Sequence, residues 1–255
     1  MSRKLIIFLG SLGLLCFSLS IQAEEQKNKD SFLAKDFSSL LELPGWNKDL
    51  LLMHFTLYQG YVKNANSLSS QIAQLSTDGK ERSYEFGALK RRLGWEYDGM
   101  RLHELYFENL GVSSVEAMDP TLLKRIKQDF GSLEAWKKDF IATGLIRGIG
   151  WVVLVQDPIT KKLYNTWINE HDVGHFIHSS PLLIMDVFEH AYITQFALDK
   201  EKYIQLFFQS INWQVVSKRW LATGCITSRP YISGCLEARQ NPLKMTGLSY
   251  QKAPG

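Results

Sequence analysis

The sequence predicts an α+β fold, in which an N-terminal antiparallel helical hairpin is followed by an α/β lobe with a small three-stranded antiparallel sheet. Two long stretches with helical periodicity, 46–75 and 83–110, are separated only by a short polar break at 77–80. Beyond them the pattern changes to short runs of β-branched and aromatic residues at 151–155 and 162–168. Helical and strand signals are therefore segregated along the chain, which is typical of α+β proteins.

The first helical stretch carries four residues that share one face. Leu50, His54, Tyr58 and Tyr61 follow one another at spacings of four, four and three residues, so their side chains point in one direction. The second stretch closes at Gly111, and glycine commonly ends helices. A short break between two long helices favours an antiparallel hairpin.

The α/β lobe begins with helical stretches after 119–120, and its first two strands flank a turn at 157–158. The run at 181–185 supplies a third strand, and helical signals return at 188–198 and 201–220. We divide the chain into a signal peptide, a tether, the helical hairpin domain, the α/β metal-binding domain and a C-terminal extension: 1–23, 24–46, 47–118, 119–220 and 221–255.

The N-terminus has the pattern of a secretory signal peptide. Arg3 and Lys4 precede an apolar run over 5–21, and Ala23 offers a small residue for cleavage before a charged segment. An uncleaved membrane anchor is the alternative. Cleavage lowers the formal net charge from +3 by the two charges of Arg3 and Lys4. We therefore expect a periplasmic or secreted protein, with no nucleic-acid partner and no stable membrane insertion after cleavage.

Cys225 and Cys235 are the cysteines that remain after cleavage. Two cysteines close in the sequence of an exported chain are typical of a disulfide that closes a small loop. Such a bridge contributes about 2–3 kcal/mol in the loop-entropy description. Two free thiols are the alternative.

Three histidines and one aspartate form a candidate metal site. Asp186 lies four residues before His190, so one helical turn would present both side chains to the same point. His103 and His54 lie on the two long helical stretches. Three imidazoles and one carboxylate suit a first-row transition metal, and an iron oxygenase with two histidines and one carboxylate fits equally well. Each histidine, taken alone, is also compatible with an ordinary core or surface position.

Five segments resemble one known family. Residues 186–192 read D-V-F-E-H-A-Y and resemble the signature D-V-W-E-H-A-Y of the iron/manganese superoxide dismutases. Residues 130–151 hold F-G-S, W-K, F and G-I-G-W, similar to the family's F-G-S…F-K…F…G-x-G-W segment. P-L-L at 181–183, Y…F-F…N-W over 203–213 and H-E-L-Y-F at 103–107 are similar to further family segments.

This resemblance, which spans about 49–220, implies the family's metal ligands and reaction. The four ligand positions fall on His54, His103, Asp186 and His190. The implied cofactor is one iron ion per subunit, with manganese, or either metal, as the alternative. The implied enzyme is a superoxide dismutase, an antioxidant oxidoreductase that converts superoxide into dioxygen and hydrogen peroxide. A catalytically silent exported protein of the same fold, which binds metal or envelope partners, is the second hypothesis.

The resemblance also assigns catalytic roles to two residues beside the ligands. Tyr61 takes the family's gateway position, although His54 precedes it by seven residues where the family has eight. Loss of one residue could remove a local bulge and leave both side chains on the metal side. The helix position that can hold a family glutamine is Gly99 here. His171, in the loop position, is therefore expected to orient solvent at the metal.

The family's dimer interface is only partly represented. A histidine between the first ligand and the gateway tyrosine is replaced by Tyr58, and a second tyrosine after the signature is replaced by Ile193. Glu189, which reaches the partner's ligand histidine in the family, is retained. The resemblance therefore implies a homodimer with Glu189 at its interface.

Overall fold

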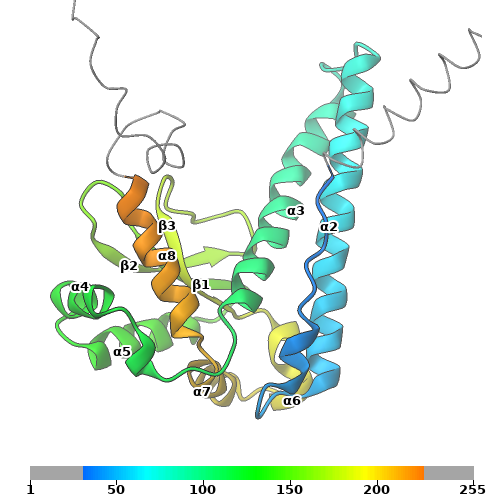
Figure 1. The fold of residues 1–255 in the computed structure, drawn as a ribbon. Helices are drawn as coiled ribbons and strands as arrows, with labels where there is room; N and C mark the ends of the chain where they lie inside the picture. Colours follow the sequence, from blue (N-terminus) through cyan, green and yellow to red (C-terminus); the bar gives the residue numbers. More distant parts are fainter. Residues whose placement is uncertain (1–30, 227–255) are drawn as a thin grey trace, which may run out of the picture.

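Two long helices stand side by side next to a three-stranded sheet (Figure 1). The computed structural model describes residues 31–226. The helices of the second half of the chain surround the sheet, with α4 and α5 below its near edge and α8 across it (Figure 1). The predicted α+β class, with a helical hairpin before a three-stranded antiparallel sheet, is confirmed.

Helices α2 (Lys48–Thr77) and α3 (Tyr84–Glu108) form the hairpin. Each begins at a residue whose side chain caps free backbone N–H groups. Asn47 accepts from the N–H groups of Asp49 and Leu50, and Ser83 accepts from that of Phe86. Both helices bury one face, and α2 continues as α-helix without an internal break.

The sheet has the order β2-β1-β3 and is antiparallel throughout. Its strands are β1 (Gly150–Gln156), β2 (Leu163–Asn169) and β3 (Ser180–Asp186). Every residue of the central strand β1 is buried, which explains why its sequence is an unbroken apolar run and does not alternate. Because β1 and β3 are paired, Trp151 lies opposite Asp186 at the end of the sheet nearest the hairpin.

The remaining helices pack around the sheet and the foot of the hairpin. They are η1 (Ser38–Glu42), η2 (Val115–Ala117), α4 (Pro120–Phe130), α5 (Leu133–Gly144), η3 (Glu189–Ala191), α6 (Ile193–Phe196), α7 (Lys200–Gln209) and α8 (Trp213–Ile226).

The predicted helices over 188–198 and 201–220 are each divided in the structure. Tyr192 leaves the helical conformation between η3 and α6. The chain between α7 and α8 pairs with the end of α3, since Ser210 accepts from Gly111 N–H and Asn212 N–H donates to the Asn109 carbonyl. This long-range pairing takes the backbone groups that a continuous helix would need.

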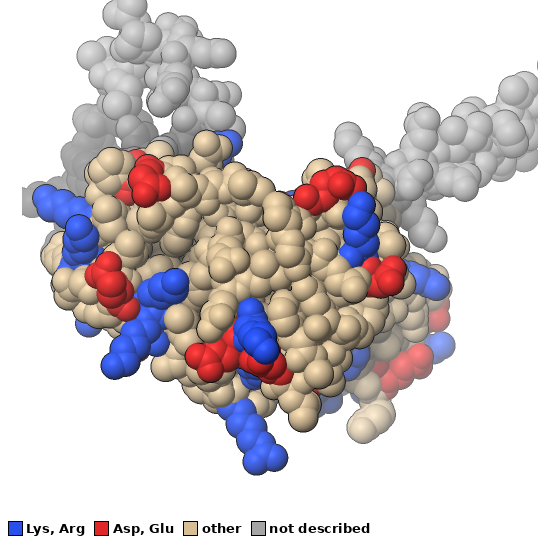
Figure 2. All heavy atoms as spheres, turned by 90° about the horizontal axis from the view of Figure 1, so that it is seen from below, with Lys and Arg blue, Asp and Glu red and all other residues tan. Residues whose placement is uncertain are grey.

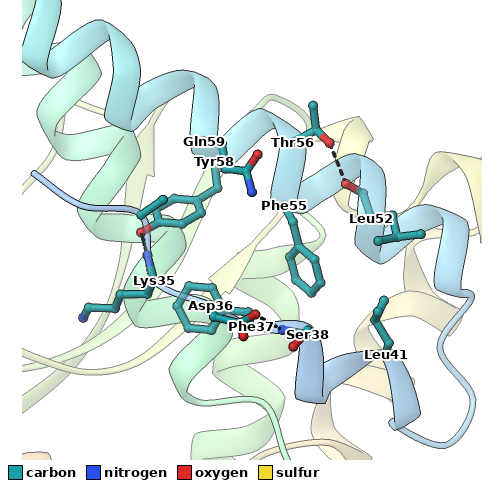
Figure 3. Close-up of a pocket in the computed structure, with 11 residues that line it drawn as sticks. Lys35, Asp36, Phe37, Ser38, Leu41, Leu52, Phe55, Thr56, Tyr58 and Gln59 are labelled. Carbon is teal, nitrogen blue, oxygen red and sulfur yellow. Dashed lines mark hydrogen bonds between the residues drawn. The ribbon is translucent and has the colours of Figure 1, made fainter.

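The N-terminal segment lies along the hairpin (Figure 3). Lys35 N–H donates to the hydroxyl of Tyr58, and the ring of Phe37 packs on that of Phe107 at 5.0 Å between centroids. Farther along, Trp46 Nε1 donates to Ser210 Oγ. These contacts join the segment to both halves of the protein. The predicted signal peptide and Cys235 lie outside residues 31–226, and the side chain of Cys225 is not among those described, so the predicted disulfide also lies outside the described part of the chain.

Glu108 on α3 forms ion pairs with Lys35 of the N-terminal segment and with Arg219 of α8. Their dependence on an ionised carboxylate predicts that the stability of the fold decreases in acid. Its carboxylate accepts from Lys35 Nζ at 2.6 Å and from Arg219 Nη2 at 3.1 Å. Burial opposes ionisation of Glu108, but these two cations outweigh it and lower its pKa below the ordinary value of 4.5. A carboxyl of this kind stabilises the fold above its unfolded pKa, and the contribution disappears as pH falls through the lowered folded value.

We therefore expect Glu108→Gln to lower the melting temperature at neutral pH. The difference in melting temperature between the variant and the wild type should become smaller as the solution becomes acidic. Thermal unfolding followed by circular dichroism over this pH range measures the difference. Glu42→Gln is the matched control, because Glu42 pairs only with the exposed Lys48. Equal effects of the two substitutions at every pH would contradict the role of Glu108.

The surface of the described residues has no obvious polyanion-binding face in the view from below. Figure 2 shows acidic and basic side chains interspersed around a broad area with few charges. Within residues 31–226, no helix has both the length and the apolar character needed to cross a bilayer.

Candidate metal centre

Four side chains from separate parts of the fold converge between the hairpin and the sheet. They are His54 from α2, His103 from α3, Asp186 at the end of β3 and His190 in η3. Their ligand atoms all lie within 4.8 Å of one another. The structure thus brings together the residues that the resemblance assigned as ligands.

The three imidazoles direct the same nitrogen at a single carboxylate oxygen. The distances from Nε2 to Asp186 Oδ2 are 3.1 Å for His54, 3.1 Å for His190 and 3.7 Å for His103. The side chains of His54, His103 and Asp186 are fully buried, whereas that of His190 is 20% exposed. The cluster is therefore buried except at His190, where it approaches the surface.

The arrangement around His103 indicates a bound cation. Its Nδ1 lies 2.6 Å from the carbonyl oxygen of Gly99, which can only accept, so Nδ1 carries the proton. In the neutral ring, Nε2 then holds a lone pair that faces the carboxylate oxygen of Asp186. No described residue donates to this buried nitrogen. A metal ion bound by this cluster would remove the repulsion, so these residues fit a metal.

The protonation states agree with this assignment. Burial lowers the pKa of His54 and lowers that of His103 well below 6.5. Burial acts against ionisation of Asp186, but His190 and His54 outweigh it and hold its pKa below the usual range. At neutral pH the cluster therefore offers an anionic carboxylate together with the neutral imidazoles of His54 and His103, a donor set that suits iron or manganese.

The backbone around Asp186 fixes its carboxylate. Asp186 Oδ1 accepts from Phe188 N–H at 2.9 Å, which leaves Oδ2 directed at the imidazoles. Its carbonyl oxygen accepts from the hydroxyl of Tyr203 at 2.6 Å. β3 ends at Asp186 and η3 begins three residues later, at Glu189. This short connection places His190 about one turn beyond Asp186.

Tyr61 also faces the cluster, and the unbroken α2 explains its seven-residue spacing from His54. Seven residues of α-helix return to nearly the same side of the helix. The Tyr61 ring stacks on that of His103, with 5.0 Å between centroids. A side chain at Gly99 would reach within 2.7 Å of the Tyr61 ring. The glycine therefore makes room for the tyrosine.

His171 is linked to Tyr61 and to the sheet. Its Nδ1 accepts from Trp151 Nε1 at 3.0 Å, and its Nε2 lies 2.8 Å from the Tyr61 hydroxyl. Burial lowers the pKa of His171 to about 4, so the ring is neutral near pH 7. Because Nδ1 accepts, the proton is on Nε2 and is donated to Tyr61.

Comparison with known proteins decides the family. The family model for the C-terminal domain of iron/manganese superoxide dismutases matches residues 118–219. A superoxide dismutase [Fe] of Cupriavidus metallidurans is 32% identical over 185 residues, which cover 71% of this chain and 91% of that protein. This chain belongs to the iron/manganese superoxide dismutase family.

Members named for different metals resemble the chain to a similar degree. A superoxide dismutase [Mn] of Haloarcula marismortui is 33% identical over 170 residues, covering 66% of this chain and 81% of that protein. A superoxide dismutase [Fe] of Aquifex aeolicus is 30% identical over 191 residues, covering 73% and 89%. The similarity therefore assigns the superoxide dismutase fold without selecting one of the two metals.

Two tryptophans near this superoxide dismutase site were not assigned a role from the sequence. Trp151 was recognised only as part of G-I-G-W, but it fixes the tautomer of His171. Trp95 lies 4.4 Å from the His171 ring and donates to Glu170 Oε2 at 3.1 Å. Its spacing of eight residues before His103 was a usable signal, because it places both on one side of α3.

The three residues at positions that the resemblance connects with the family's dimer interface differ in their exposure to solvent. Tyr58 is buried within its own subunit, where its hydroxyl donates to Glu104 and accepts from Lys35 N–H (Figure 3). Glu189 is exposed, and Ile193 is 41% exposed. Tyr58 therefore contacts the N-terminal segment of its own chain.

Proposed function

We propose that this chain disproportionates superoxide into dioxygen and hydrogen peroxide at one metal ion held by His54, His103, Asp186 and His190. The observation that carries the proposal is the convergence of three Nε2 atoms on Asp186 Oδ2 in a buried centre. Membership of the iron/manganese superoxide dismutase family supports the same reaction.

A metal ion held there would supply the redox chemistry, since it could accept an electron from one superoxide and return an electron to the next. The three histidines and the Asp186 carboxylate would hold the ion, and one anionic ligand would leave a trivalent ion positively charged and so attractive to a small anion. Two protons are consumed with the second superoxide. The surrounding residues must therefore deliver protons as well as exclude other reactants.

The chain Trp151–His171–Tyr61 supports the proposed proton delivery. Trp151 donates to His171, and neutral His171 donates from Nε2 to the Tyr61 oxygen. The hydroxyl proton of Tyr61 is thereby left to point into the site. Burial raises the pKa of Tyr61, so the hydroxyl stays protonated and can donate to the developing peroxide.

We expect His171→Leu to lower the activity about 10–100-fold while metal content is retained, because His171 supports the site without binding the metal. His171→Gln should retain much more activity, since an amide can accept from Trp151 and donate to Tyr61. Activity and metal content are measured on the same samples. His178→Asn, which removes an exposed imidazole of the same loop, is the control. Equal activity of all three variants would contradict the role of His171.

The proposed cofactor is one iron ion per subunit, with manganese, or either metal, as the alternative. The experiment is to produce the full chain, load it separately with iron and manganese, and measure inhibition of superoxide-driven cytochrome c reduction. Activity with one metal that is lost in His190→Ala supports the enzyme and identifies its cofactor. Near-stoichiometric metal binding without activity would favour the second hypothesis, a catalytically silent exported metal-binding protein.

The proposed homodimer would cover the exposed edge of the metal centre. His190 is the one partly exposed ligand of the four, and Glu189 and Ile193 are exposed beside it. A partner placed there would shield the ligand and bring a carboxylate to it. Sedimentation analysis of the wild type and of Glu189→Lys tests this arrangement, and a monomeric wild type would exclude it.

The proposed location is the periplasm or the exterior of the cell, with a C-terminal extension after the superoxide dismutase domain. The support is the sequence of the first 23 residues. Cell fractionation and N-terminal sequencing test it. A mature chain that begins at Glu24 is expected, whereas an uncleaved chain in the membrane fraction would favour the anchor.

A further inference from the structure

A second pocket lies at the opposite end of β1 from the metal centre. It has a volume of about 380 Å³ and is bounded by α4, α8, the end of β1 and the β1–β2 turn. Trp151, beside the metal ligands, and Gln156, in the pocket, are five residues apart on one strand. This spacing corresponds to about 17 Å. The pocket is therefore separate from the superoxide dismutase site.

Three of the described residues that line this pocket are positively charged, and the others are uncharged. Lys124, Arg125 and Lys161 line it, and none of the described lining residues carries a carboxylate. Arg125 Nε is paired with Asp129 at 2.6 Å, outside the lining. Arg125 Nη2 also donates to the Thr160 carbonyl at 3.5 Å, so the two lysines are the cations of the lining for which no ion pair is found among the described residues.

Two buried polar atoms in the pocket lack partners. Among residues 31–226, nothing hydrogen-bonds to Lys161 Nζ or to Gln156 Oε1, and neither atom is accessible to solvent. Gln156 as a whole is 2% exposed. Leaving a buried ammonium unpaired is costly. Lys161 also has a left-handed backbone, with φ of 62°, which adds about 1 kcal/mol of strain for a residue other than glycine.

We propose that this pocket binds a small oxyanion of the phosphate class. Lys124 and Arg125 can donate to phosphate oxygens at the pocket. A turn of the buried Lys161 and Gln156 side chains toward the space would let Lys161 Nζ donate to the same anion and Gln156 Oε1 accept from a protonated phosphate oxygen. The C-terminal segment 227–255 is the nearest alternative occupant by sequence. It contains four basic side chains and one acidic side chain, so its charge matches the pocket poorly.

Titration calorimetry of the full, metal-loaded chain with inorganic phosphate tests the site. Saturable binding at one site is expected, and Lys161→Met should weaken it at least about tenfold, since a charge-assisted bond is lost. Lys162→Met is the matched control, because it removes the same charge from the neighbouring exposed residue outside the pocket. Absence of saturable binding, or equal losses in both variants, would overturn the proposal.

Gln156→Glu is expected to change phosphate binding and the stability of the free protein in opposite directions. The new carboxylate should prevent phosphate binding, while it supplies a negative partner for Lys161 and raises the melting temperature of the free protein. Superoxide dismutase activity should stay unchanged in Lys161→Met and Gln156→Glu. Undiminished phosphate binding by Gln156→Glu, or tighter binding of acetate than of phosphate by the wild type, would contradict the assignment.

Discussion

Asp186→Asn is expected to abolish superoxide dismutase activity and metal binding together. Asp186 Oδ2 is the atom on which all three Nε2 atoms converge, and its carboxylate is the one negative charge in the buried donor set. Asparagine has nearly the same shape and can still accept from Phe188 N–H. The fold should therefore survive, while the metal loses its anionic ligand.

Metal content should fall below about a tenth of the wild-type value and activity below about 1%, because even supporting residues around a metal typically change affinity 10–100-fold. Metal analysis and the cytochrome c assay measure both quantities. Asp49→Asn, an exposed change at the start of α2, controls for loss of a surface charge. If Asp186→Asn bound metal with wild-type affinity, the convergence on Oδ2 would not reflect a metal site.

Gly150→Ala is expected to be the most destabilising single methyl addition near the site. A Cβ at Gly150 would overlap the carbonyl oxygen of Ile168 on β2, where backbone cannot move aside cheaply. Gly150 O also accepts from Val187 N–H, next to Asp186. A cost of at least about 3 kcal/mol follows from forced separation of the strands.

This cost corresponds to a fall in melting temperature of roughly 6–12 °C for a chain of this size. Thermal unfolding of the apo and metal-loaded forms measures it. Gly60→Ala is the control, since a Cβ there meets nothing within 4 Å inside α2. Alanine should stabilise that helix by about 0.5–1 kcal/mol. A Gly150→Ala variant as stable as Gly60→Ala would show that β1 and β2 are less closely paired than described.

Local patterns were sufficient to predict most elements. Helical periodicity located both long helices, because their buried faces repeat through many turns, and the apolar runs located three strands. The break at Ser210–Asn212 could not be found in this way. It depends on hydrogen bonds to Asn109 and Gly111, about a hundred residues earlier, and helical propensity contains no information about such partners.

The metal site depended on more than periodicity. The spacing of Asp186 and His190 suggested a common centre, but nothing local to His54 or His103 distinguished a ligand from a core histidine. Only the family resemblance identified His54 and His103 as ligands of the same metal site as Asp186 and His190. The role of Trp95 was missed because its contacts with His171 and Glu170 exist only after α3 and the loop following β2 are packed together.

Because Gly99 has no side chain, α3 cannot supply a hydrogen-bonding group to the metal site at this position, and the loop residue His171 is the proposed substitute. The four residues of the metal cluster belong to helices, a strand end and η3, whereas His171, which we propose tunes them, belongs to the loop between β2 and β3. Under this proposal, the residues that hold the ion and the residue that adjusts its reactivity belong to different parts of the fold. A local opening of this loop would lower the activity and leave the ion in place, so metal occupancy alone would not report a fully active molecule.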